Sequence, residues 1–157
     1  MERAKMLGLI IGIVGLIILL WPIAFTVLAS AYYIPHDIQF FGYVRQGDYY
    51  DLGSAILFGI AFAFGAAAII LFRNRRRVYS MLLSTIIGAL GFAPQTVEFS
   101  VSGFGNQLLV TTVLAFVTVF LLFISTILFS ISTKQQKKNS LSGREDKTLP
   151  FPARTHS

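Results

Sequence analysis

Four arginines crowd into the segment FRNRRRVY, residues 72–79, which lies between two long apolar runs. Guanidinium groups at this density bind phosphate groups, so the segment suits nucleic acid, a phosphate-bearing ligand or the headgroups of a membrane. Nucleic acid is the least favoured partner, because neither Phe72 nor Tyr79 belongs to a groove-reading motif. The elements on either side of the arginines therefore decide what they bind.

The other side chains that could carry chemistry are His36, Asp37, Asp48 and Asp51. A histidine with several carboxylates can bind a divalent ion, but the spacing of these residues matches no metal motif. We expect a solvated acidic loop, and we assign no metal site, cofactor or catalytic residue. The chain has no cysteine, which excludes disulfides, thiolate nucleophiles and iron–sulfur centres.

The composition is that of a membrane protein, with 55% hydrophobic and 13% charged residues and a mean hydropathy of +0.71. A membrane-spanning helix needs about 20 apolar residues. Uncharged runs of about this length occupy residues 7–29, 52–72, 78–97 and 108–131. We therefore predict an all-α membrane protein, a four-helix antiparallel transmembrane bundle in residues 1–133, followed by a tail in residues 134–157.

The first run has a second interpretation, because a basic start, an apolar stretch and Ala29-Ser30-Ala31 also match a cleaved signal peptide. The length of the apolar run favours its retention as a span. Cleavage would leave the other three spans oriented as before.

Charge is distributed unevenly between the connecting segments. Every Lys and Arg except Arg45 lies near the N-terminus, in residues 73–77 or after Thr133. The positive-inside rule then places both termini in the cytoplasm, and we expect the cell membrane as the location. The basic residues interpreted as topology determinants and contacts for anionic lipid headgroups are Arg73, Arg75, Arg76, Arg77, Lys134, Lys137 and Lys138.

Each span carries a stripe of small or hydroxyl side chains at steps of three, four or seven residues. Such residues let helices approach closely in lipid, where little hydrophobic drive acts between helices. The predicted packing residues are Gly8, Gly12 and Gly15, then Gly59, Ala63 and Ala67, then Ser84, Gly88 and Gly91, and finally Thr111, Thr118 and Ser125.

The segments outside the spans differ in composition. Residues 30–53 are rich in aromatic side chains, which suits the headgroup level of a membrane. The outer segments 38–44 and 98–107 are compatible with a short β hairpin, or the outer loop with a short helix in the interface. The tail from Lys134 is polar and basic, so we expect it to be disordered.

Ion-coupled transporters usually carry an ionisable residue inside a span, and the four runs contain none. Our leading hypothesis is a non-enzymatic accessory or scaffolding subunit that binds other membrane proteins or itself. The alternative is a small oligomeric channel or a carrier for neutral or apolar solutes, lined by hydroxyls such as Thr111 and Thr118. The architecture resembles tetraspan families, claudin-like proteins included. Because the chain lacks cysteine and its only tryptophan, Trp21, lies in the first span, we assign no family.

Overall fold

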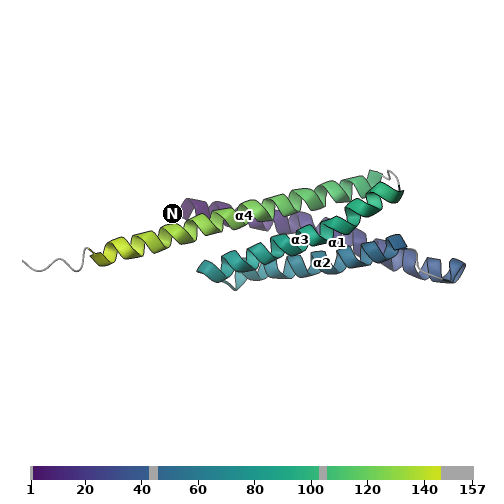
Figure 1. Cartoon of the computed structure of the whole chain (residues 1–157), viewed down its shortest axis with the longest axis horizontal. Coiled ribbons are helices and arrows are strands. Elements are labelled where there is room, and N and C mark those ends of the chain that lie inside the picture. Colours follow the sequence, from purple (N-terminus) through teal and green to yellow (C-terminus); the bar gives the residue numbers. More distant parts are fainter. Residues whose placement is uncertain (1, 43–45, 103–105, 146–157) are drawn as a thin grey trace, which may run out of the picture.

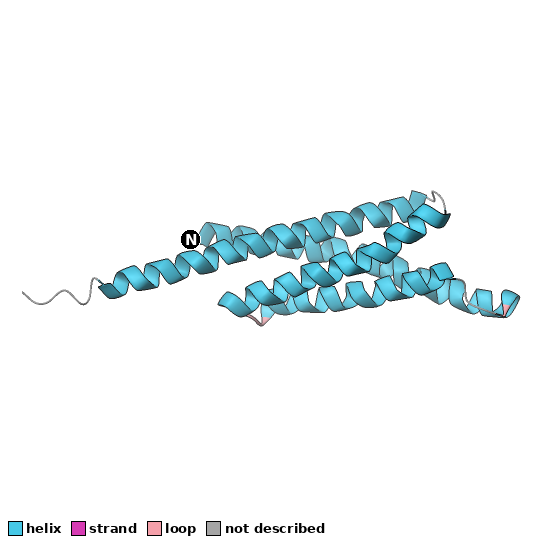
Figure 2. Ribbon diagram, in the orientation of Figure 1, coloured by secondary structure: helices cyan, strands magenta, loops and turns pink. Residues whose placement is uncertain are grey.

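The computed structural model describes residues 2–42, 46–102 and 106–145, and these form four α-helices. Helices that follow one another in the sequence run in opposite directions (Figure 1). Each helix packs against two others, α1 and α3 both contacting α2 and α4. The predicted all-helical class is confirmed (Figure 2). The helices are α1 (Glu2–Phe41), α2 (Gln46–Ile70), α3 (Asn74–Ser102) and α4 (Asn106–Glu145).

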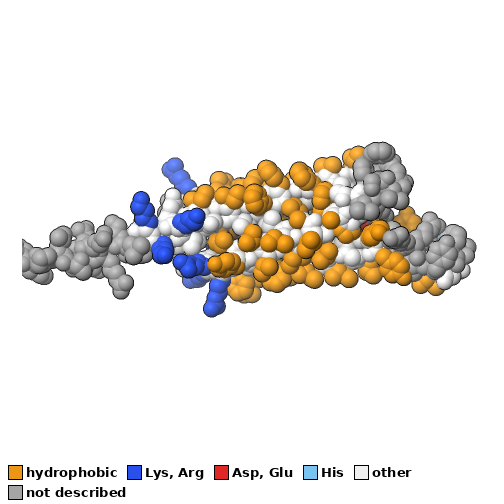
Figure 3. All heavy atoms as spheres, viewed as in Figure 1, with side chains coloured by type: hydrophobic (Ala, Val, Ile, Leu, Met, Phe, Trp, Pro, Cys, Tyr) orange, Lys and Arg blue, Asp and Glu red, His pale blue; other side chains and the backbone are white. Residues whose placement is uncertain are grey.

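All four helices contain a segment long and apolar enough to cross a membrane, which confirms the predicted number of candidate spans. These segments are Arg3–His36, Tyr49–Ile70, Asn74–Pro94 and Leu109–Asn139. Large apolar side chains cover the sides of the molecule (Figure 3), whereas a water-soluble protein rarely exposes so continuous an apolar surface. The chain therefore has the surface of an integral membrane protein.

The interior combines a few large side chains with many small ones. Leu19, Phe58 and Leu122 are completely buried, and alanines from α2 and α4 fill the space beside them. Gly8, Gly12 and Gly15 of α1 face α4: a Cβ added at Gly12 would lie 2.9 Å from Ser125 Oγ. Because these three glycines have no side chains, the backbones of α1 and α4 come close together.

Hydroxyl groups bond to the backbone of the neighbouring helix where helices approach closely. Ser84 Oγ donates to the Ala61 carbonyl of α2 at 2.6 Å, and Ser80 Oγ donates to the Phe64 carbonyl one turn away at 2.7 Å. Ser125 Oγ of α4 donates to the Gly8 carbonyl of α1 at 2.7 Å. Such bonds contribute about 0.6 kcal/mol each on average in membrane proteins.

The face of α2 that packs inside the molecule is not the one carrying the predicted stripe. Ala63 is exposed, Gly59 and Ala67 are only partly buried, and a Cβ added at Gly59 meets no atom within 4 Å. The buried face carries Ser54, Ala55, Phe58, Ala61, Gly65 and Ala68 instead. Small residues occur all round α2, so spacing alone could not identify the buried face.

The C-terminal ends of α1 and α3 extend further than predicted. No strand occurs in the described residues, and residues 38–41 and 98–102, considered for a hairpin, are helical. Helix α1 continues through Pro35 to Phe41, and Gly42 follows it with a left-handed φ of 73°. An isolated two-stranded hairpin is only marginally stable, whereas extending an existing helix adds a hydrogen bond per residue. Tyr32 and His36, one turn apart, stack at 6.2 Å on this extension.

The first part of the predicted tail also forms a helix, because α4 continues past Thr133 to Glu145. Lys and Gln are good helix formers, and a helix that is already nucleated propagates through such residues easily. Residues 146–157 of the predicted tail lie outside the described part of the chain.

The packing predicts a large effect on stability for one glycine substitution and a small effect for another. Gly91→Leu should lower the free energy of unfolding by about 1–3 kcal/mol, because a Cβ there meets the buried Phe58 ring at 3.0 Å and Leu57 Cβ at 3.1 Å. Gly59→Leu should change it by less than about 0.5 kcal/mol. Denaturant unfolding of both variants in one detergent measures this, and equal losses would contradict the assignment of the buried faces.

Candidate functional site

The described basic side chains gather at one end of the molecule, where the α2–α3 turn, the start of α1 and the end of α4 meet (Figure 3). They come from Arg3 and Lys5, from residues 73–77, and from the segment 134–138 of α4. Arg45, Arg144, Lys147 and Arg154 lie outside the described side chains. This end is the part of the structure with the clearest capacity to bind an oppositely charged partner.

Arg77 differs from the other arginines because its side chain turns back onto α2. Its Nε donates to the carbonyls of Ala68 at 2.9 Å and Phe72 at 3.0 Å, and its Nη2 donates to that of Ile69 at 3.4 Å. The guanidinium carbon also lies 5.3 Å from the centre of the Phe129 ring of α4. Carbonyls at a helix C-terminus lack partners and carry partial negative charge, so Arg77 caps α2 and connects it to α4.

The turn that precedes α3 holds the remaining arginines outward. Asn74, the first residue of α3, has a φ of 53°, in the left-handed region that asparagine tolerates better than most residues. Arg73, Arg75 and Arg76 around it are exposed. The first backbone N–H groups of a helix lack intrahelical partners, so the start of α3 adds partial positive charge beside these side chains.

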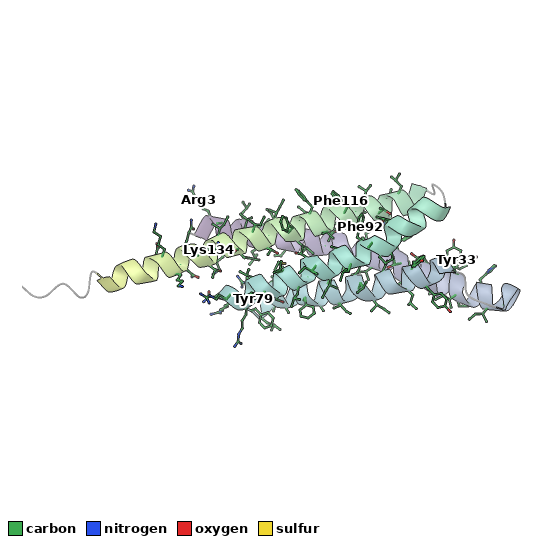
Figure 4. The ribbon with its side chains drawn as sticks, viewed as in Figure 1. Arg3, Tyr33, Tyr79, Phe92, Phe116 and Lys134 are labelled. Carbon is green, nitrogen blue, oxygen red and sulfur yellow. The ribbon has the colours of Figure 1, made fainter. Side chains whose placement is uncertain are left out.

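An open, groove-like cavity of about 920 Å³ lies between this turn and α4. One wall carries Arg73, Arg75 and Arg76 with Val78 and Tyr79, and the other carries Thr133, Lys134 and Lys137 of α4. Tyr79 and Lys134 lie at the same end of the molecule, on these two helices (Figure 4). The volume is within the range of about 300–1,000 Å³ that is usual for ligand pockets.

The lining determines what this cavity could bind. Five cationic side chains surround it, and no acidic residue is among its described lining residues. Val78 and Tyr79 add an apolar side to the same space. A ligand with concentrated negative charge next to an apolar portion would complement both. Of the other basic residues predicted for headgroup contact, Lys138 is exposed outside this lining and Arg77 is turned inward.

The acidic group considered for metal binding cannot be assembled from the described side chains. Among the residues that the structure describes, no three His, Asp or Glu side chains come together in a group that could hold a metal ion. The side chains of Asp37 and Asp48 lie outside the description. Asp51, expected in a solvated loop, lies instead within α2, which begins at Gln46. Its side chain is only 5% exposed.

Sequence reasoning identified the basic residues but not the wall formed by α4. Lys134 and Lys137 line a cavity because the helix continues past the apolar span, whereas a disordered tail would have provided no fixed second wall. The separate role of Arg77 was also missed. Its position one turn inside α3, next to apolar Val78, is the only sequence signal that distinguishes it from its neighbours.

Arg77 and Arg75 should therefore respond differently to loss of charge. Arg77→Met should lower the free energy of unfolding by about 2 kcal/mol, because it leaves carbonyls at the end of α2 without their donor and removes the contact with Phe129. Arg75→Met, at an exposed position, should cost less than about 0.5 kcal/mol. Denaturant unfolding in detergent compares them, and equal stability of the two variants would rule out the capping role.

Comparison with known proteins adds no assignment to this geometry: no protein-family model matches the chain, and no curated protein or solved structure is significantly similar to it.

Proposed function

We propose that this chain is a non-enzymatic four-span membrane protein that binds other membrane proteins as an accessory or scaffolding subunit. The observation that carries the proposal is the outward stripe of Gly59, Ala63 and Ala67 on α2. These small residues recur every four positions, and a Cβ added at Gly59 would meet no atom within 4 Å. A stripe of this kind permits close approach of another helix, and in it Ala63 is exposed while Gly59 and Ala67 are only partly buried.

A second regular face on α4 also supports contact with another helix. Large apolar side chains recur there at alternating steps of four and three, and each is between 42% and 59% exposed. This heptad spacing suits a shallow left-handed crossing, although the same side chains suit lipid tails equally well. The α2 stripe is therefore the better guide to the interface. The residues of the α4 face are Leu109, Val113, Phe116, Phe120, Phe123 and Ile127.

The hydroxyl row of α4 gives less support to the alternative of a channel or carrier. Thr111, Thr118 and Ser125 are buried, but the Ser125 hydroxyl is bonded to the Gly8 carbonyl of α1. Leu19 and Leu122 are completely buried in the same interior. These contacts favour a role in joining helices. If vesicles that contain the protein show more solute flux than protein-free vesicles, the channel or carrier function would be supported instead.

For orientation, we propose that both termini lie in the cytoplasm and that the basic end contacts anionic lipid headgroups. The support is the gathering of basic side chains at one end of the molecule (Figure 3) together with the positive-inside rule. The chain has no cysteine, so Asn139→Cys and Tyr49→Cys each supply a single labelling site near opposite ends. Labelling of Asn139→Cys by an impermeant maleimide in intact cells would contradict this orientation, because it would place residue 139 outside the cell.

The subunit role predicts a complex that depends on the α2 stripe. The full chain, tagged at its C-terminus and extracted in mild detergent, should co-purify with a stoichiometric membrane partner, identified by native mass and mass spectrometry. Gly59→Leu/Ala63→Leu should reduce the recovered complex at least tenfold, because two leucines prevent close helix approach.

The matched control for this experiment is Ala24→Leu/Ala89→Leu, which adds similar bulk at exposed alanines of α1 and α3 and should leave the complex intact. A wild-type chain that is monomeric and without partner would refute the proposal. A homogeneous self-oligomer would favour the channel alternative instead.

A further inference from the structure

We propose that the cavity between the α2–α3 turn and α4 is a specific binding site for a phospholipid that carries at least two phosphate groups. This inference requires only that the basic end lies at a membrane surface, and it is independent of the proposed protein partner. It goes beyond general attraction to anionic lipid, because it assigns one open groove between two helices to one chemical class of lipid.

Positive charge is concentrated around the cavity. Arg73, Arg75 and Arg76 face the cavity from one side and Lys134 and Lys137 from the other, with no acidic residue among the described lining residues. Like charges held around one space repel one another, and an anion placed between them relieves that repulsion. A headgroup with a single negative charge would neutralise a small part of this set. A lipid with two or more phosphates matches it better.

The donors that line the cavity also have a geometry that suits phosphate. Guanidinium groups bind phosphate oxygens through paired N–H donors, and three of the five cations are arginines. Asn74, the first residue of α3, also lines the cavity, so the positively polarised start of this helix lies beside the arginines.

The apolar side of the cavity favours a lipid over a soluble phosphate compound. Val78 and Tyr79 line the cavity on the side that leads into the apolar part of α3, and Tyr79 is exposed. Tyrosine is common at the level of lipid headgroups. Leu82, one turn after Tyr79 on α3, and Ile131, one turn before Lys134 on α4, are also exposed apolar side chains outside the cavity lining. A phospholipid could place its phosphates among the cations and its acyl chains along these side chains, whereas a soluble phosphate compound would leave the apolar side unused.

The test measures lipid binding by the full-length protein in mild detergent, using native mass spectrometry to follow titration with three lipids. Cardiolipin carries two phosphates, phosphatidylserine carries one, and phosphatidylcholine is zwitterionic. The wild-type chain should bind cardiolipin at least tenfold more tightly than phosphatidylserine. Arg76→Gln/Lys134→Gln, with one change in each wall, should weaken cardiolipin binding by about thirtyfold.

The matched control is Arg3→Gln/Lys5→Gln, which removes the same charge from exposed positions at the same end but outside the cavity lining. It should weaken cardiolipin binding by less than threefold. Equal weakening in both double variants, or equal binding of cardiolipin and phosphatidylserine, would overturn the proposal, because either result indicates general surface attraction.

Two further measurements address a soluble ligand and a misfolded variant. Inositol hexakisphosphate should not displace cardiolipin at comparable concentration, and displacement would identify a site for soluble phosphate compounds instead.

If the double variant does not fold, a photoreactive cardiolipin on the wild-type chain decides the question. Cross-links within residues 73–79 and 130–137 would support the site, and cross-links confined to other segments would refute it.

Discussion

The structure depends on how closely its helices approach one another at positions without bulky side chains. In lipid, burial of apolar side chains provides little drive for helix association, so van der Waals contact and hydrogen bonds must supply it. Ser84 can reach the Ala61 carbonyl only because α2 and α3 come close, with Gly65 and Gly88 nearby. Ser125 reaches the Gly8 carbonyl across α1 and α4 for the same reason. Each contact satisfies a hydroxyl that would be costly to leave unpaired in an apolar interior.

This packing also explains the position of the basic end. Because α2 and α3 are held close along their length, the turn between them is short, and Arg77 can fold back onto the carbonyls that end α2. The contact of Arg77 with Phe129 brings α4 to the same place, and the extension of α4 then stands opposite Arg75 and Arg76. One arginine therefore stabilises the turn, while its neighbours remain available for anionic partners.

Much of the architecture could be predicted from the sequence, because it follows from long uncharged runs. A backbone in hydrocarbon must satisfy its own hydrogen bonds, so such runs form helices. The buried face of each helix was harder to predict. The glycine stripe from Gly8 to Gly15 packs inside the molecule, whereas Gly59 and Ala63 face outward. The predictions of a possible short hairpin and of a disordered tail from Lys134 rested on composition, and the described parts of these segments are helical instead. The composition of a segment does not show whether a helix precedes it. A helix that is already formed at Ala29 or Ile131 continues easily through the residues that follow. The difference between Arg77 and Arg76 depends on three-dimensional contacts.

The central claim is that the four helices of one chain pack in this arrangement within the membrane, with α1 directly against α4. The most direct test uses Gly12→Cys/Ser125→Cys in the naturally cysteine-free chain, because a Cβ at Gly12 would lie 2.9 Å from Ser125 Oγ. Oxidation in native membranes should give an intramolecular disulfide in most of the protein, and Ala63→Cys/Ser125→Cys should give none. Absence of the first cross-link, with both cysteines accessible after unfolding, or formation of the second, would contradict the arrangement.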